Sequence, residues 1–149
     1  MLGWLVHPLP LAAIALTFLN DHVLKGSGLL PAWLTGKLSD FAGLVFFPLL
    51  LVSAWELLRD RGPSRLALNV ACIATAIVFT LAKTTTVGSL AFQWGLGLAQ
   101  WPFRFLAGDS LAPVAHVMDP TDLIALPSIL FAWWIGAART RTPHTTSAM

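Results

Sequence analysis

Four apolar runs, each close to the length of a membrane-spanning helix, dominate this sequence of 149 residues. They cover residues 2–22, 38–58, 66–84 and 120–138. A helix that crosses the hydrocarbon core of a bilayer needs roughly 20 mostly apolar residues. Only 11% of the residues are charged, whereas ordinary soluble domains carry about 25%. We therefore expect lipid to be the solvent for much of the protein surface.

A further apolar stretch, residues 89–105, carries a polar stripe between the third and fourth runs. Gln93, Gly97, Gln100 and Arg104 recur at helical spacing, so a helix would place them along one narrow face. This pattern predicts an interfacial or re-entrant helix, although a fifth span whose stripe faces the other helices stays open. We predict an all-α integral membrane bundle of four transmembrane helices, with this additional helix between spans three and four.

The distribution of basic residues predicts an orientation for this single transmembrane domain of residues 1–139. With four spans, one side carries Arg59, Arg61, Arg65, Arg139 and Arg141, and the other carries Lys25, Lys37, Lys83 and Arg104. Lysine and arginine are enriched in cytoplasmic loops. The arginine side is therefore predicted to be cytoplasmic together with both termini, and residues 140–149 are predicted to be a disordered tail.

Four polar clusters interrupt the apolar pattern, and an even number of crossings places all four at the outer face. They are Asn20-Asp21-His22 with Lys25, Lys37-Leu38-Ser39-Asp40, Lys83-Thr84-Thr85-Thr86, and Asp119-Pro120-Thr121-Asp122. Ionisable groups at membrane depth are costly, so they usually face one another or line a site. The last cluster also predicts a helix start, with Asp119 as the N-cap and Pro120 as the first helical residue.

The first functional hypothesis is recognition of an anionic lipid headgroup at these clusters. Lysine and arginine side chains would supply positive charge, and threonine hydroxyls would supply hydrogen-bond donors. The candidate ligand-binding residues are Lys25, Lys37, Asp40, Lys83, Thr84, Thr85, Arg104, Asp119 and Asp122. Membrane lipid is the predicted partner, and a homo-oligomer is left open. Because no basic run with interleaved aromatic residues is present, nucleic-acid binding is not expected.

Two alternative interpretations of the same clusters stay open. Asp21, His22, Asp40 and Asp122 could bind a cation or activate water in a membrane-embedded hydrolase or transferase. The sequence has no H-E-x-x-H motif, nucleophile elbow or phosphate loop, so no dedicated metal or cofactor is predicted. Alternatively, the nearly balanced charges form only an ion-pair network that fastens helix ends in a structural subunit or scaffold.

The three remaining histidines are interpreted as structural residues. His7, His116 and His144 do not form a pair at matching depth with His22 in the four-span arrangement, so haem ligation is not expected.

Two short stretches resemble VanZ-like membrane proteins. The segment 36–44, Gly-Lys-Leu-Ser-Asp-Phe-Ala-Gly-Leu, is similar to the opening of that family's second helix; Lys37 and Phe41 match, whereas Gly36 and Asp40 depart from it. The segment 119–125 resembles the start of the family's last helix. The chain is also similar to uncharacterised small bacterial membrane proteins that combine K-L-S-D-F-A-G with D-P-T-D. These resemblances imply a helical protein of the bacterial inner membrane with an envelope-related role and a lipid-linked envelope precursor as a possible partner; they supply no catalytic residues.

Overall fold

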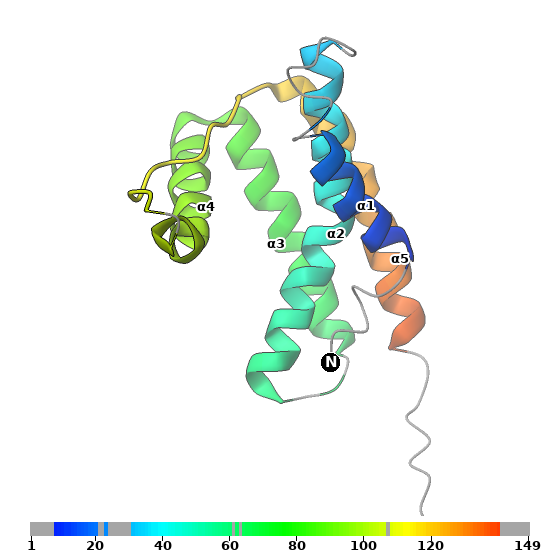
Figure 1. Cartoon of the computed structure of the whole chain (residues 1–149). Helices are drawn as coiled ribbons and strands as arrows, with labels where there is room; N and C mark the ends of the chain where they lie inside the picture. Colours follow the sequence, from blue (N-terminus) through cyan, green and yellow to red (C-terminus); the bar gives the residue numbers. More distant parts are fainter. Residues whose placement is uncertain are drawn as a thin grey trace, which may run out of the picture. The chain divides into compact units, whose positions relative to one another are not determined.

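Helices form the regular structure of the protein throughout the part of the chain that the computed structural model describes (Figure 1). The described residues are 8–20, 23, 31–60, 62, 64–106 and 108–140. In chain order the helices are α1 (Pro8–Leu19), α2 (Ala32–Arg59), α3 (Arg65–Thr84), α4 (Thr86–Leu106), the 3-10 helix η3 (Pro120–Ser128) and α5 (Ile129–Arg139). No strand occurs among these residues, so the all-α prediction is confirmed for them.

Three helical segments are long and apolar enough to cross a membrane, and they coincide with three of the predicted spans. They are Trp33–Arg59, Arg65–Thr84 and Pro120–Ala138. The first predicted span, residues 2–22, is represented among the described residues by α1, whose apolar stretch Pro8–Thr17 is shorter than a membrane span. The count of four spans therefore stays a prediction, and the predicted tail lies outside the described residues apart from Thr140.

Large apolar side chains on the three long helices point outward. Leu58 is 82% exposed, Leu66 is 73% exposed and Leu130 is 66% exposed. Soluble monomers rarely expose extended apolar surface, because water makes such exposure unfavourable. Lipid would cover these side chains, so the exposed leucines agree with the composition in indicating a multi-pass membrane protein.

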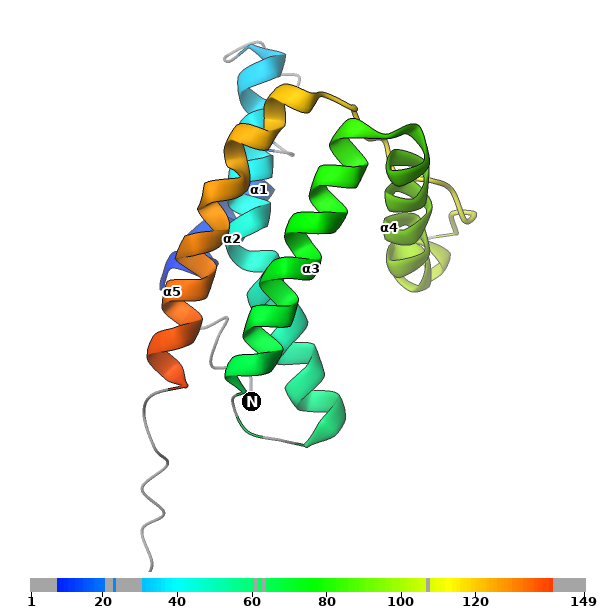
Figure 2. The same ribbon diagram turned by 180° about the vertical axis from the view of Figure 1, so that it is seen from behind.

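The chain divides into two compact units. Unit 1 comprises Met1–Ala76 and Ile124–Met149, and unit 2 comprises Ile77–Leu123. In unit 1, α2 packs against both α1 and α5 (Figure 2). The α2 side chains Leu44, Leu49 and Val52 are almost completely buried at the centre of this packing.

A buried amide connects the end of α1 to the beginning of α2. Asn20 is fully buried, and its side-chain amide nitrogen donates to the Thr35 carbonyl at 2.8 Å and to the Ser39 hydroxyl at 2.6 Å. Apolar packing alone is non-directional, whereas these two hydrogen bonds fix how the two helices align along their length.

Gly136 permits a close approach between α5 and the part of α3 that belongs to unit 1. A Cβ atom built at Gly136 would lie 2.5 Å from both terminal carbons of Leu68, a side chain with no exposed surface. One turn away, the Trp133 indole N–H donates to the Asn69 side-chain oxygen at 2.9 Å. The small residue and the hydrogen bond together hold α5 against α3.

The segment before α5 follows a 3-10 path over nine residues, which is longer than most helices of this type. Pro127 lies inside it and supplies no backbone N–H, so a regular α-helical hydrogen bond cannot form there. The Ser128 hydroxyl, at the end of this segment, donates to the Ala125 carbonyl at 2.7 Å.

In unit 2, the extended segment 108–116 runs back along α4 and covers part of its polar stripe. The Val114 N–H donates to the Gln93 carbonyl at 3.1 Å, and the Ala112 carbonyl lies against Gly97 so closely that a Cβ there would overlap it. At the far end, Asp109 lies beside Arg104. The predicted helix 89–105 is therefore present as part of α4, and most of its stripe faces the protein's own chain.

The close contact at Gly136 predicts a stability difference between two glycine substitutions in helices. Gly136→Ala should be less stable than the matched Gly95→Ala by about 1–3 kcal/mol, because the added methyl meets buried Leu68 and overpacks the contact. Nothing lies within 4 Å of a Cβ at Gly95, so both variants share the gain in helix propensity and differ in the clash. Thermal unfolding in detergent measures the difference; equal stabilities would contradict the close packing.

Candidate functional site

The turn between α3 and α4 is built around one threonine hydroxyl. Thr85 donates through Oγ1 to the Leu81 carbonyl at 2.8 Å, and the same oxygen accepts the Gly88 N–H at 3.0 Å. It therefore caps the end of α3 and the start of α4 at once. Gly88 is required here, because a Cβ would overlap the Leu81 carbonyl. The turn ends α3 directly after Lys83 and Thr84.

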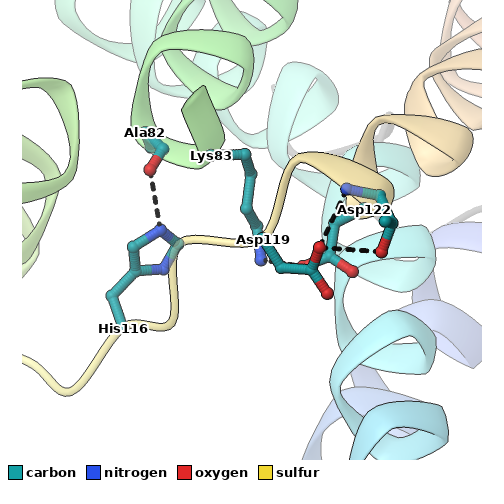
Figure 3. Close-up of polar contacts among 6 residues, drawn as sticks. Ala82, Lys83, His116, Asp119 and Asp122 are labelled. Carbon is teal, nitrogen blue, oxygen red and sulfur yellow. Dashed lines mark hydrogen bonds and ion pairs between the residues drawn. The ribbon is translucent and has the colours of Figure 1, made fainter. Parts of the chain in front are cut away.

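Lys83 forms a buried ion pair with Asp122 (Figure 3). The Lys83 Nζ atom lies 2.7 Å from Asp122 Oδ2, and only 6% and 9% of the two side chains are exposed. The ammonium also lies 5.6 Å from the centre of the Phe79 ring, one turn earlier on α3. A pair this short and this buried keeps two opposite charges together in an apolar setting.

The backbone at Asp122 is set by the predicted N-cap. Asp119 accepts hydrogen bonds from the Thr121 N–H at 2.9 Å and from the Thr121 hydroxyl at 2.8 Å, and the Asp122 N–H donates to the Asp119 carbonyl at 3.0 Å. Helix η3 then begins at Pro120. The predicted roles of Asp119 and Pro120 are thus confirmed.

His116 lies beside the ion pair and binds the end of α3. Its Nε2 atom donates to the Ala82 carbonyl at 3.2 Å, and its ring centre is 4.9 Å from that of Phe92 on α4. Burial lowers the pKa of His116 below its ordinary value of 6.5, and the Lys83 charge lowers it further. These effects outweigh the Ala82 hydrogen bond and the Asp122 carboxylate, which raise the pKa. His116 is therefore neutral at pH 7, with its proton on Nε2.

Sequence reasoning identified Lys83, Asp119 and Asp122 but missed the place of His116 among them. The interpretation of His116 as a structural residue agrees with its contacts. One signal could have indicated the contact of His116 with Ala82. His116 lies six residues before Asp122, in a segment that must return to the end of α3.

The predicted hydroxyl donors Thr84 and Thr85 are both exposed but direct their hydrogens inward along α3. Thr84 donates to the Thr80 carbonyl at 2.7 Å, as Thr85 does to Leu81. In this arrangement the two hydroxyls offer acceptor oxygens and no donor to a ligand.

The other candidate residues belong to unit 1, form a different ion pair on α4, or lie outside the described part of the chain. Lys37 and Asp40 are half-buried on α2 and belong to unit 1. Arg104 is partly exposed, with its Nε atom 3.8 Å from Asp109 Oδ2, an exposed pair of the kind that adds little stability. Asp21, His22 and Lys25 lie outside the described residues. The predicted convergence of all four clusters on one face stays a prediction.

The polar groups around Asp122 take part in an ion pair and in hydrogen bonds within the protein. Asp122 faces the Lys83 ammonium, Asp119 accepts the two Thr121 hydrogen bonds, and the Nε2 proton of His116 faces a backbone carbonyl. Among the residues that the structure describes, no three His, Cys, Asp or Glu side chains are grouped so that they could hold a metal ion.

Comparisons with known proteins find no relative. The chain matches no family model, no curated protein and no solved structure. The resemblance to VanZ-like proteins, which rests on short motifs, therefore stays a prediction.

The buried ion pair predicts a strong coupling between Lys83 and Asp122. Lys83→Met or Asp122→Leu alone should lower the free energy of unfolding by about 3–5 kcal/mol, because each leaves a buried charge without its counter-ion. The double variant Lys83→Met/Asp122→Leu should recover much of that loss. Thermal unfolding in detergent of all four proteins gives the coupling energy; two strictly additive losses would contradict a direct pair.

The lowered pKa of His116 predicts a loss of stability in mild acid. As the pH falls below 6.5, His116 becomes protonated in the unfolded chain before it does so in the folded protein, because its folded pKa is lower. Protonation therefore favours unfolding, and stability decreases until the pH falls below the folded pKa. His116→Gln keeps a donor for Ala82 without a titrating ring. Its unfolding midpoint should fall less than that of the parent between about pH 7 and pH 5, and parallel profiles would show that His116 is not the responsible group.

Proposed function

We propose that this chain is a small multi-pass protein of the bacterial inner membrane that binds an anionic lipid or a lipid-linked headgroup in an envelope-related role. In this proposal the chain crosses the membrane four times, both termini are cytoplasmic, and the headgroup binds at the outer ends of the apolar helices. Three long apolar helices with outward-facing leucines support the membrane setting. The resemblance to VanZ-like proteins supports the envelope role.

The observation that carries the proposal is the buried positive charge at the end of an apolar helix. Lys83 lies in the last turn of α3, and its ammonium is 2.7 Å from the carboxylate oxygen Oδ2 of Asp122. A phosphate headgroup has the same sign of charge as that carboxylate and more acceptor oxygens. An anionic lipid would therefore compete with Asp122 for the Lys83 ammonium, and Asp122 holds the cation in place when no lipid is bound.

The exposed face of α4 supports an interfacial position for this helix. Trp94 and Trp101 are 49% and 40% exposed there, next to Leu98 and Phe105. Tryptophan is enriched at the boundary between hydrocarbon and headgroups. With Gln93 and Gly97 of the polar stripe covered by segment 108–116, α4 would lie in this boundary and bring the partly exposed Arg104 near the headgroups.

A second candidate function is that of a structural subunit in which the ion pair only fastens the end of α3 to the start of η3. The low exposure of both side chains, 6% and 9%, favours this alternative. In that case no lipid binds at Lys83, and the membrane-embedded domain would act as a scaffold for another protein.

The two candidates differ in the effect of neutralising Asp122. If lipid competes for Lys83, Asp122→Asn should increase the anionic phospholipid retained through purification in detergent, because the competing carboxylate is lost, and Lys83→Met should decrease it. Asp119→Asn is the matched control, since it removes a negative charge three residues away while asparagine keeps the N-cap. Quantitative lipid mass spectrometry measures retention.

Folding is checked separately by thermal unfolding of each variant. If Asp122→Asn and Lys83→Met remain folded and retain the same amount of anionic lipid as the parent, the lipid proposal is wrong and the fastening role holds. Lys83→Arg, which keeps the charge, should retain lipid like the parent and separates loss of charge from loss of fold.

A further inference from the structure

Two arginines flank the turn between α2 and α3, at the end of unit 1 where α5 also ends (Figures 1 and 2). Arg59 is the last residue of α2, and Arg65 is the first residue of α3. Both residues are exposed. This end of the molecule is separate in sequence and in composition from the cluster around Lys83.

Each arginine lies over a tryptophan ring. The Arg59 guanidinium carbon is 4.4 Å from the centre of the Trp55 ring, and that of Arg65 is 5.3 Å from the centre of the Trp133 ring. Trp133 is itself held by the hydrogen bond from its indole N–H to Asn69. A guanidinium that contacts an aromatic face keeps its N–H edge available for a planar or tetrahedral anion.

Arginines outnumber acidic residues in the stretch of sequence around this connection. Residues 56–65 contain Arg59, Arg61 and Arg65 against Glu56 and Asp60. Glu56 is only 2% exposed, so its carboxylate is withdrawn from the surface on which the arginines lie. Asp60 caps α2 in a left-handed backbone conformation, with φ of 46°.

Exposed leucines lie beside the two arginines in the sequence. Leu58, before Arg59, is 82% exposed, and Leu66, after Arg65, is 73% exposed. Tryptophan favours the depth at which headgroups meet acyl chains, and arginine binds phosphate through two parallel hydrogen bonds. A soluble anion would use only the guanidinium groups, whereas a phospholipid would use the leucines as well.

We infer that Arg59, stacked on Trp55, and Arg65, stacked on Trp133, bind the phosphate groups of acidic phospholipids at this end of unit 1, where the exposed Leu58 and Leu66 would contact acyl chains. Different residues form this site and the one proposed at Lys83, so the two proposals can be tested independently.

The test compares phosphatidylglycerol with phosphatidylcholine as ligands of the full chain in detergent. Lipid binding is measured by native mass spectrometry and by the shift in unfolding temperature. For the double variant Arg59→Gln/Arg65→Gln, we expect roughly 10- to 30-fold weaker phosphatidylglycerol binding, from the loss of two charges near a headgroup. Phosphatidylcholine binding should be unchanged.

Three further arms decide between explanations. Arg139→Gln/Arg141→Gln removes the same net charge at and after the end of α5 and should retain phosphatidylglycerol binding; an equal loss there would mean that only the net charge at this end matters. Arg59→Lys/Arg65→Lys keeps the charge but not the planar guanidinium and should bind with intermediate affinity. Inorganic phosphate alone should give no shift in unfolding temperature.

Two results would overturn the inference. One is a double variant, Arg59→Gln/Arg65→Gln, that is folded and binds phosphatidylglycerol as tightly as the parent. The other is a shift with inorganic phosphate as large as the shift with lipid, which would make this a site for a free anion. Trp55→Leu should weaken lipid binding while leaving both arginines in place, which tests the contribution of stacking separately from charge.

Discussion

Lys83 and Asp122 can both remain charged in an apolar setting because each neutralises the other at 2.7 Å. The rest of unit 2 serves to bring these two side chains together across 39 residues of sequence. Thr85 ends α3 directly after the lysine, and Asp119 fixes the backbone that carries the aspartate. The segment 108–116, which leads from α4 to Asp119, contacts α4 at Gly97 and Gln93. It contacts the end of α3 through His116.

The apolar helices were predictable because length and hydropathy are local properties. The predicted spans 38–58, 66–84 and 120–138 agree with α2, α3 and the pair η3–α5, although α2 begins earlier, at Ala32. Hydropathy excluded this first part of α2 because Thr35 and Lys37 are polar. Thr35 is nevertheless helical and buried, since its carbonyl accepts the Asn20 amide from another helix.

The candidate site was predictable as a set of residue types and not as a set of contacts. Sequence marked Lys83 and Asp122 as charges at the ends of apolar runs, and it identified the Asp119 cap from a four-residue pattern. The partner of a charge depends on how helices pack, which no local spacing encodes. His116 is another example, because its hydrogen bond to Ala82 depends on the path by which the segment 108–116 returns to α3. In the sequence, this segment is marked only by the lack of a helical pattern.

The direct contact between Lys83 and Asp122 in a lipid bilayer is the central claim. Solid-state NMR of protein in bilayers, with nitrogen-15 in the lysine side chains and carbon-13 in the aspartate carboxyl groups, measures it through their dipolar coupling. The account predicts a strong coupling from the Lys83 ammonium to a carboxylate carbon, which disappears in Asp122→Asn protein that lacks the labelled carboxylate. A Lys83 ammonium with no coupling to any aspartate carboxylate would contradict it.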